Sequence, residues 1–536
     1  MPDTPRPEQL DVVIVGAGFS GMYMLYRLRE LGMSARVIEA GSGVGGTWYW
    51  NRYPGARCDV ESMDYSYSFS PELEQEWEWT ERYPAQPEIL RYAEHVADRF
   101  DLRRDMVFET RVSSAHYDEA ADRWLVRTDT GHAISARFCV MATGCLSVPK
   151  WPEVDGVEEF AGRTFHTGRW PHEGVDFTGR RVGVIGTGSS AIQSIPQIAA
   201  QASAVTVFQR TANFSMPAHN RPLSKEEQAD LKARYREYRQ AARESFVGVP
   251  RPLPTRNALD VSHEERVQTY SAGWDYGGLF GLTGAYLDTR LSEEANETAA
   301  EFVRSKIREI VSDPEVARRL SPYDHPLGTK RPCVDTGYYK IYNEPHVDLV
   351  DVRATPITKV TPTGVQTSDA TYEFDDLVFA TGFDAMTGAL NAIDIRGRDG
   401  AALKEKWAEG PRTYLGVSVA GFPNLFMITG PGSPSVLSNM MVSIEQHVEW
   451  VSDCLGHLKS NGLSTIEPTD EAENAWVEHV NEVGAATLYP KANSWYMGAN
   501  VPGKPRVFMP YVGGVGPYRE HCTRIAAEGY TGFVLA

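Results

Sequence analysis

Two stretches of the sequence decide the fold: DVVIVGAGFSG, residues 11–21, and RVGVIGTGSSA, residues 181–191. In each, an apolar run typical of a buried strand leads into closely spaced small residues. These are Gly16, Gly18 and Gly21 in the first stretch, and Gly186, Gly188 and Ala191 in the second. Such a strand, tight turn and helix present the helix N-terminus to a pyrophosphate, because small residues allow the turn, the approach of the phosphate and the packing of helix on strand. The sequence therefore predicts two dinucleotide-binding units.

The two units differ about 20 residues further on, where the next strand ends. The first unit continues as ARVIEA and carries Glu39, whereas the second continues as AVTVFQRT and carries Arg210 and Thr211. A carboxylate at this place accepts hydrogen bonds from ribose hydroxyls and repels a 2′-phosphate, while a guanidinium binds that phosphate bidentately. We therefore expect FAD or NAD at the first unit and NADP at the second.

Composition narrows the class of protein. The chain has 536 residues, enough for two or three domains, and its hydrophobic and charged fractions of 42% and 23% are ordinary for a globular enzyme. The net charge of −18 disfavours nucleic acid and anionic membranes as partners. No apolar run is long enough for a transmembrane helix, and the polar opening MPDTPRPEQL is unlike a signal peptide. We expect a cytoplasmic protein without a membrane partner.

The six cysteines lie scattered along the chain with no metal-ligand spacing. Reduced structural thiols are the favoured interpretation, and no metal site is expected.

The domain organisation follows from two apolar strands that end in Ala-Thr-Gly, FCVMATG at 138–144 and LVFATGF at 377–383. They are interpreted as the points where the chain crosses between the nucleotide units, with Pro149 and Pro152 marking a linker. The stretch from about 220 to 324 is densely charged with helical spacing.

We therefore expect an α/β fold with two Rossmann-like dinucleotide-binding domains and a helical insertion in the second. The expected boundaries are 1–150 and 383–536 for the first domain, 151–217 and 326–382 for the second, and 218–325 for the insertion. After the second crossing, the segment from Ser443 predicts a helix that Gly462 ends.

An aromatic segment, GGTWYWNRYPGARCDVES at 45–62, follows Glu39 closely. Its glycine pair allows the backbone to approach a flat ligand, and the Trp48 ring can pack against an isoalloxazine. Arg57 and Asp59 are charges among these aromatic residues. Core packing of the aromatic rings, and a surface position for the Asp59 carboxylate, are the alternative interpretations.

A third pattern, FAGRTFHTGRWP, precedes the second glycine turn and has the form F-x-G-x-x-x-H-x-x-x-W-P. Its residues are Phe160, Gly162, His166, Trp170 and Pro171. With GTKR at 328–331 and GPGSPSVLSNM at 430–440, it resembles the fingerprint of the flavin-dependent Baeyer–Villiger monooxygenases, which insert oxygen beside a ketone carbonyl. The resemblance spans nearly the whole chain, and members that oxidise aryl and steroidal ketones are the most similar in pattern.

The resemblance implies an enzyme that uses NADPH, FAD and O₂, through a C4a-peroxyflavin, to convert ketones into esters or lactones, with sulfoxidation as a side activity. Bulky cyclic, aryl or steroidal ketones are the expected substrates, and a monomer or weak oligomer is the expected state. Arg331 would stabilise negative charge in the reaction, and Asp59 would hold this arginine. From the residues alone, His166 is interpreted as a hydrogen-bonded structural group rather than an acid or base.

The resemblance also implies the ligand contacts. For FAD these are Gly16, Gly18, Ser20, Gly21, Glu39, Gly46, Thr47, Trp48, Asp59, Tyr65, Val112 and Met440. For NADP they are Arg57, Cys58, Thr187, Gly188, Ser189, Ser190, Gln193, Arg210, Thr211, Lys330, Arg331 and Trp495. For the ketone pocket they are Ser435, Val436, Leu437 and Met440, in a loop of small and apolar residues.

Other functions stay open at this point. Flavin monooxygenases that oxidise nitrogen or sulfur share the glycines and the histidine but usually carry Tyr or Phe where this chain has Trp170. A disulfide reductase on the same paired domains needs a redox cysteine pair, and the sequence has no C-x-x-C or C-x₄-C. A non-catalytic redox sensor that binds NADP is the remaining alternative.

Overall fold

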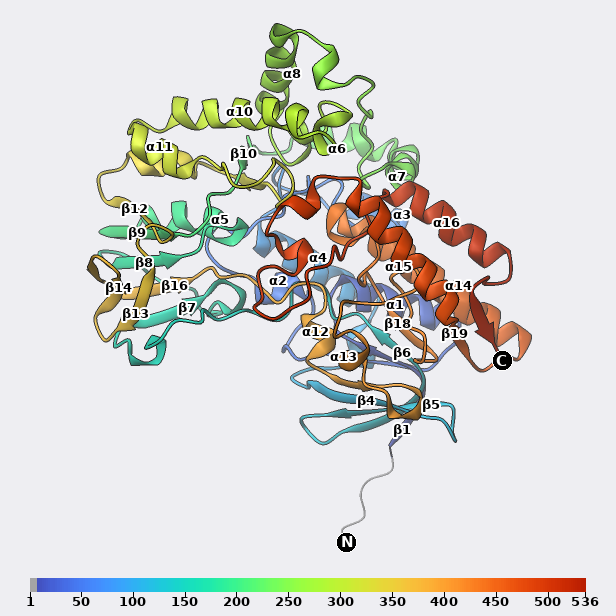
Figure 1. Ribbon diagram of the computed structural model, residues 1–536. Helices are drawn as coiled ribbons and strands as arrows, with labels where there is room; N and C mark the ends of the chain where they lie inside the picture. Colours follow the sequence, from blue (N-terminus) through green and yellow to red (C-terminus); the bar gives the residue numbers. More distant parts are fainter. Residues whose placement is uncertain (1–6) are drawn as a thin grey trace.

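The computed structural model describes residues 7–536 (Figure 1). The first glycine turn forms as predicted: strand β1 (Glu8–Val15) enters the turn, helix α1 (Phe19–Glu30) leaves it, and β2 (Ala35–Ile38) follows. The first six residues lie outside the described residues. They include most of the polar opening MPDTPRPEQL, which the sequence predicted to be unlike a signal peptide.

The first domain is built on an eight-stranded sheet to which both ends of the chain contribute. The path runs β17-β4-β5-β6-β1-β2-β3, with β18 paired to β6. Strands β6, β1, β2 and β3 are parallel neighbours, whereas β5 is antiparallel to both β4 and β6. Besides β1 and β2, the strands of this sheet are β3 (Met106–Val107), β4 (Val112–Asp118), β5 (Arg123–Thr128), β6 (Ala133–Met141), β17 (Asp394–Arg396) and β18 (Leu425–Met427).

The second domain has a five-stranded, fully parallel sheet in the order β12-β9-β8-β16-β7. Its strands are β7 (Arg163–His166), β8 (Arg181–Ile185), β9 (Ala204–Gln209), β12 (Val347–Asp351) and β16 (Asp376–Phe379). The second glycine turn joins β8 to α5 (Ser189–Ala199). An antiparallel sheet of β13 (Ile357–Thr361), β14 (Gly364–Thr367) and β15 (Thr371–Glu373) flanks this domain.

The charged stretch is helical, as predicted, and it runs across the top of the molecule in Figure 1. Its helices are α6 (Lys225–Lys232), α7 (Tyr235–Glu244), α8 (His263–Tyr276), α9 (Phe280–Thr283), α10 (Glu293–Ile310) and α11 (Pro314–Leu320). The stretch packs on both domains: Tyr235 and Val249 belong to the core of the first, whereas Tyr270 and Val303 belong to the core of the second. The insertion therefore packs on both domains, whereas the sequence predicted an insertion belonging to the second domain alone.

Helix α14 (Met440–Asn461) begins three residues before the predicted Ser443 and ends where Gly462 adopts a left-handed conformation with φ 68°. It packs against α1. The remaining α-helices and strands are α2 (Thr47–Trp50), α3 (Pro71–Glu76), α4 (Gln86–Arg99), α12 (Gly388–Asn391), α13 (Leu403–Lys406), α15 (Asp470–Ala485), α16 (Val515–Ala527), β10 (Ser215–Pro217), β11 (Cys333–Asp335), β19 (Ile466–Pro468) and β20 (Phe533–Leu535). Within residues 7–536, no helix combines the length and apolar character that crossing a membrane requires.

Candidate active site

One cavity of about 1390 Å³, here called the main cavity, is lined by both glycine turns and by the segments that connect them. Parallel sheets expose their ligand sites at the carboxyl ends of the strands, and both turns follow such ends. The main cavity is therefore the place where two nucleotides can meet.

The first turn is shaped for a close ligand approach. Gly16 has φ +107°, and a Cβ added there would lie 2.6 Å from the carbonyl oxygen of Ala142. A Cβ at Gly21 would lie 1.9 Å from the Gly16 oxygen. The buried Glu39 carboxylate accepts hydrogen bonds from the Ala17 amide at 2.8 Å and the Gly41 amide at 2.7 Å, so it fixes the turn. This glycine cradle and the carboxylate beside it fit FAD.

The second turn leaves room where a phosphate would lie. Gly186 repeats the positive φ of Gly16, at +114°, but an added Cβ at Gly188 would meet no protein atom within 4 Å. The Thr187 hydroxyl donates to the Thr211 carbonyl at 2.7 Å, which ties the turn to the end of the next strand. The open cradle fits NADP.

Cations gather around Thr211. Arg210 is exposed beside it, and Lys330 lies close enough that the charge of Arg210 acts on its ammonium group. Burial, and then the charges of Arg210 and Arg353, lower the pKa of Lys330. Arg353, which sequence reasoning missed, donates to the Thr211 hydroxyl at 2.9 Å and pairs with Asp324. It follows β12, the strand next to β9 in the sheet, and the sheet order is the information that the sequence lacked.

Arg331 and Asp59 form a bidentate pair at the wall of the main cavity. The guanidinium Nε donates to Asp59 Oδ2 at 2.7 Å and Nη2 donates to Oδ1 at 2.9 Å, while Nη1 donates to the Val436 carbonyl at 2.6 Å. Burial alone would lower the pKa of Arg331, but the Asp59 charge and hydrogen bonds raise it well above its usual range. The side chain is therefore a fixed cation, with part of its donor capacity unused.

A further residue lies against this guanidinium. The Tyr496 hydroxyl interacts with Arg331, and burial raises the pKa of the phenol. Tyr496 follows the predicted Trp495 directly, so the aromatic pair in NSWYMG was the signal that could have identified it.

The aromatic segment lines the same cavity. The Trp48 ring donates to the Tyr65 hydroxyl at 3.0 Å, and both rings are buried. Burial raises the pKa of the Cys58 thiol, so this cysteine is protonated and unreactive at neutral pH. Arg57 also lines the cavity, but its guanidinium turns to Glu81 and the Tyr83 carbonyl, which leaves it less available to NADP than the sequence suggested.

His166 joins the two crossing segments. Its Nδ1 accepts from the Gly168 amide at 2.9 Å, so Nε2 carries the proton and bonds the Lys150 carbonyl at 3.1 Å, with the Thr381 hydroxyl 3.2 Å away. The ring is 1% exposed, and burial lowers its pKa. The neutral imidazole, with both ring nitrogens hydrogen-bonded, holds the two crossing segments together.

Most of the predicted site residues reach the main cavity. It is lined by Gly16, Gly18, Ser20, Glu39, Gly46, Thr47, Trp48, Arg57, Cys58, Asp59, Tyr65, Val112, Trp170, Thr187, Gly188, Ser189, Ser190, Gln193, Arg210, Thr211, Lys330, Arg331, Val436, Met440 and Trp495. The predicted residues that do not line it are Gly21, Phe160, Gly162, His166, Pro171, Ser435 and Leu437. Leu437 faces a second, small cavity behind the loop, beside Phe246 and Tyr489.

The chain is similar to known flavoenzymes over its whole length. Residues 13–246 match the family model described as pyridine nucleotide-disulphide oxidoreductase. The chain is 43% identical over 527 residues to a Baeyer–Villiger monooxygenase of Pseudooceanicola batsensis, covering 98% of this chain and 96% of the relative. It is 42% identical over 528 residues to a phenazine N-monooxygenase of Lysobacter antibioticus, covering 98% and 97%. Among solved structures, an oxidised steroid monooxygenase bound to NADP superposes with a TM-score of 0.95 at 55% identity, covering 98% of this chain and 99% of the other.

Proposed function

The chain belongs to the Baeyer–Villiger monooxygenases, and from this premise we propose that it converts bulky cyclic, aryl or steroidal ketones into esters or lactones. The overall reaction consumes a ketone, NADPH, a proton and O₂. One oxygen atom enters between the carbonyl carbon and the migrating carbon, and the other leaves as water. The two electrons come from NADPH, which becomes NADP⁺.

The first glycine turn, Glu39 and Trp48 would hold FAD, and the second turn with Arg210 and Lys330 would hold NADPH. Bound FAD would supply the chemistry that side chains lack, taking two electrons from NADPH and activating O₂. The common cavity supports this arrangement, because hydride transfer requires the two cofactors to meet.

Arg331 carries the proposal. Negative charge develops on the ketone oxygen when the carbonyl carbon becomes tetrahedral, and a preorganised cation stabilises that charge at no cost of reorganisation. The Asp59 fork fixes the guanidinium at 2.7 and 2.9 Å, so its remaining donors keep one direction. Asp59 acts through Arg331 and is a positioning residue.

Similarity to a solved structure indicates the size of the ketone. The 55% identity to a steroid monooxygenase supports a bulky substrate. A cytoplasmic location is also proposed, because all six cysteines are unpaired, as in a reducing compartment.

A second candidate function, N-oxygenation, is favoured by one observation. The phenazine N-monooxygenase is nearly as similar to this chain as the Baeyer–Villiger relative. Overall likeness to named relatives therefore does not by itself separate the two activities.

The test is a substrate panel with the purified, yellow protein and NADPH. Cyclohexanone, an aryl ketone and a steroid bearing an acetyl side chain are compared with phenazine, and products are identified by mass spectrometry. Esters from the ketones support the proposal. If only N-oxides form, the second candidate function, N-oxygenation, is supported instead. If no product depends on NADPH, the protein is better explained as a sensor.

A further inference from the structure

The loop 435–439, which leads into α14 and is here called the substrate loop, is contacted from two opposite sides. On the cavity side, Arg331 donates to the Val436 carbonyl at 2.6 Å. On the other side lies the segment 245–251 of the insertion, here called the insertion arm, whose Val247 carbonyl accepts from the Asn439 amide at 2.8 Å. The position of the catalytic guanidinium is thus linked to a segment outside the nucleotide folds.

Asn439 makes the connection with its side chain. Its Oδ1 accepts from the Met441 amide at 3.1 Å and so caps α14. Its Nδ2 donates to the Asp64 carbonyl at 2.8 Å and to the Gly248 carbonyl at 3.3 Å. At 1% exposure, this side chain joins α14, the first domain and the insertion arm.

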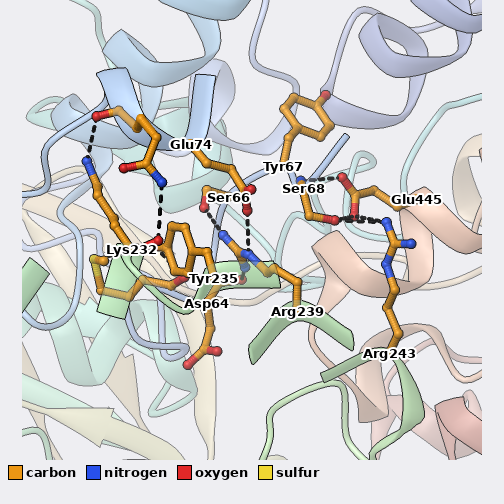
Figure 2. A network of polar contacts seen from close by, with 12 residues as sticks. Asp64, Ser66, Tyr67, Ser68, Glu74, Lys232, Tyr235, Arg239, Arg243 and Glu445 are labelled. Carbon is orange, nitrogen blue, oxygen red and sulfur yellow. Dashed lines mark hydrogen bonds and ion pairs between the residues drawn. The ribbon is translucent and has the colours of Figure 1, made fainter. Parts of the chain in front are cut away.

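The helix before the arm is anchored by buried charge (Figure 2). Arg239 on α7 donates to Glu74 at 2.9 Å and to the Ser66 hydroxyl at 2.5 Å, with the two charged side chains 7% and 8% exposed. Arg243 bonds the Ser68 hydroxyl at 3.0 Å, and Figure 2 shows it beside Glu445 of α14.

Moving α7 would leave these buried charges unpaired, which is strongly unfavourable. The arm therefore starts from a fixed point on the first domain.

The substrate loop needs such support because its backbone is strained. Ser435 has φ 22°, a conformation that a residue with a side chain rarely adopts and that persists only where the surroundings impose it. The surroundings here are Arg331 inside, the insertion arm outside and Asn439 at the end of the loop.

We propose that Asn439 is a positioning residue for the ketone site. Through it the insertion arm fixes the substrate loop, hence the Val436 carbonyl, and hence the direction of the Arg331 guanidinium. The inference rests on the proposed function, since it assigns the loop to a ketone pocket. It makes the helical insertion a support behind the active-site wall, since no residue of the insertion, residues 218–325, lines the main cavity itself.

The test compares wild type with Asn439→Ala as FAD-loaded protein. Amide hydrogen exchange of peptides covering 434–441 reports the loop directly, and we expect about tenfold faster exchange. With a ketone that the wild type oxidises, the share of NADPH electrons recovered in ester is expected to fall at least about threefold, with the rest in H₂O₂, and the KM for the ketone to rise.

Two further variants guard against a folding defect. Asn439→Ser keeps a good helix cap but loses the bonds to Asp64 and Gly248, so it should show the same fall in coupling with less loss of stability. Gly248→Ala disturbs the contact from the arm: the residue has φ +72°, and its Cβ would lie 3.1 Å from Asn439 Cβ. It should shift exchange and coupling in the same direction.

Asn424→Ala is the matched control. Asn424 is equally buried and also joins backbone segments, donating to the carbonyls of Arg137 and Ser464 and accepting from Ile466, but it does not line the main cavity. It should lose stability with coupling unchanged.

Equal coupling in the Asn439 variants and wild type, or an equal loss in the Asn424 control, would overturn the inference. A wild type that forms no ester from any ketone would instead overturn the proposed function, and the exchange measurement would still report on the loop.

Discussion

Replacing Arg331 with alanine is expected to separate ligand binding from ester formation. The change removes two hydrogen bonds to Asp59 and one to the Val436 carbonyl, together with the cation at the cavity wall. Loss of one preorganised donor to a developing oxyanion costs about 3–4 kcal/mol, or about 10²–10³ in rate. We expect ester formation to fall by that factor, while FAD stays bound through the first glycine turn and NADPH through Arg210 and Lys330.

The substitution has a side effect that the structure allows to be controlled. Asp59 is 20% exposed, so without its partner it becomes a partly desolvated, unpaired carboxylate that lowers the free energy of unfolding. The double variant Arg331→Ala/Asp59→Ala removes both charges and should regain stability without regaining ester formation. Arg331→Lys keeps the charge but lacks the planar fork, so it should also fail to restore the wild-type rate.

The assay follows three quantities in one reaction: NADPH consumed, H₂O₂ released and ester formed. The flavin spectrum and NADP⁺ affinity are measured beside them. Wild-type ester formation by Arg331→Ala would refute the assignment of this side chain. Loss of FAD from the variant would show that Arg331 is a binding residue rather than a group that acts in the reaction.

Three other changes test the cofactor sites and the buried charges. Gly16→Ala would place a Cβ 2.6 Å from a backbone oxygen at φ +107°, so the protein should purify without yellow colour; a normal flavin spectrum would contradict the FAD assignment. Arg210→Ala should weaken NADP⁺ binding by about 10–100-fold, the worth of a charge-assisted hydrogen bond, with NAD⁺ affinity unchanged by calorimetry; parallel losses would place Arg210 away from the 2′-phosphate. Asp64→Asn should stabilise the protein by about 3 kcal/mol at pH 7, because burial raises the pKa of Asp64 to about 6, well above its value of about 3.9 in an unfolded chain. The folded state thus prefers the protonated carboxyl, so the stability gained by Asp64→Asn should be full above about pH 6 and vanish below about pH 4. Denaturant titrations at several pH values measure this gain. A gain that does not change with pH would show that the charge of Asp64 is not its cause.

Local patterns in the sequence predicted the parts of the structure that depend on local geometry. The glycine turns follow from residue spacing, and the end of α14 follows from Gly462, which adopts the left-handed conformation that ends a helix. The charges that distinguish the two nucleotide units, Glu39 and Arg210, stand at fixed distances from their turns, and the structure brings both to the main cavity.

What the sequence could not predict depends on contacts between distant segments. Arg353 reaches Thr211 only because β12 lies beside β9 in the sheet. Leu437 and Val436 are neighbours in the chain, but the strained loop turns them to different cavities.

The insertion shows the same limit. Its charge pattern predicted helices but not that α7 is anchored to the first domain through Arg239 and Glu74, since an ion pair between residues 165 positions apart leaves no local pattern.

The central claim is that this chain inserts one atom of molecular oxygen beside a ketone carbonyl, and isotopic labelling tests it most directly. A ketone that the protein oxidises is incubated with NADPH under ¹⁸O₂ in ordinary water, and the ester is analysed by mass spectrometry. The account predicts one ¹⁸O atom in the ester, at the oxygen between the carbonyl and the migrated carbon. An ester without label, or with label only at the carbonyl oxygen, would contradict it.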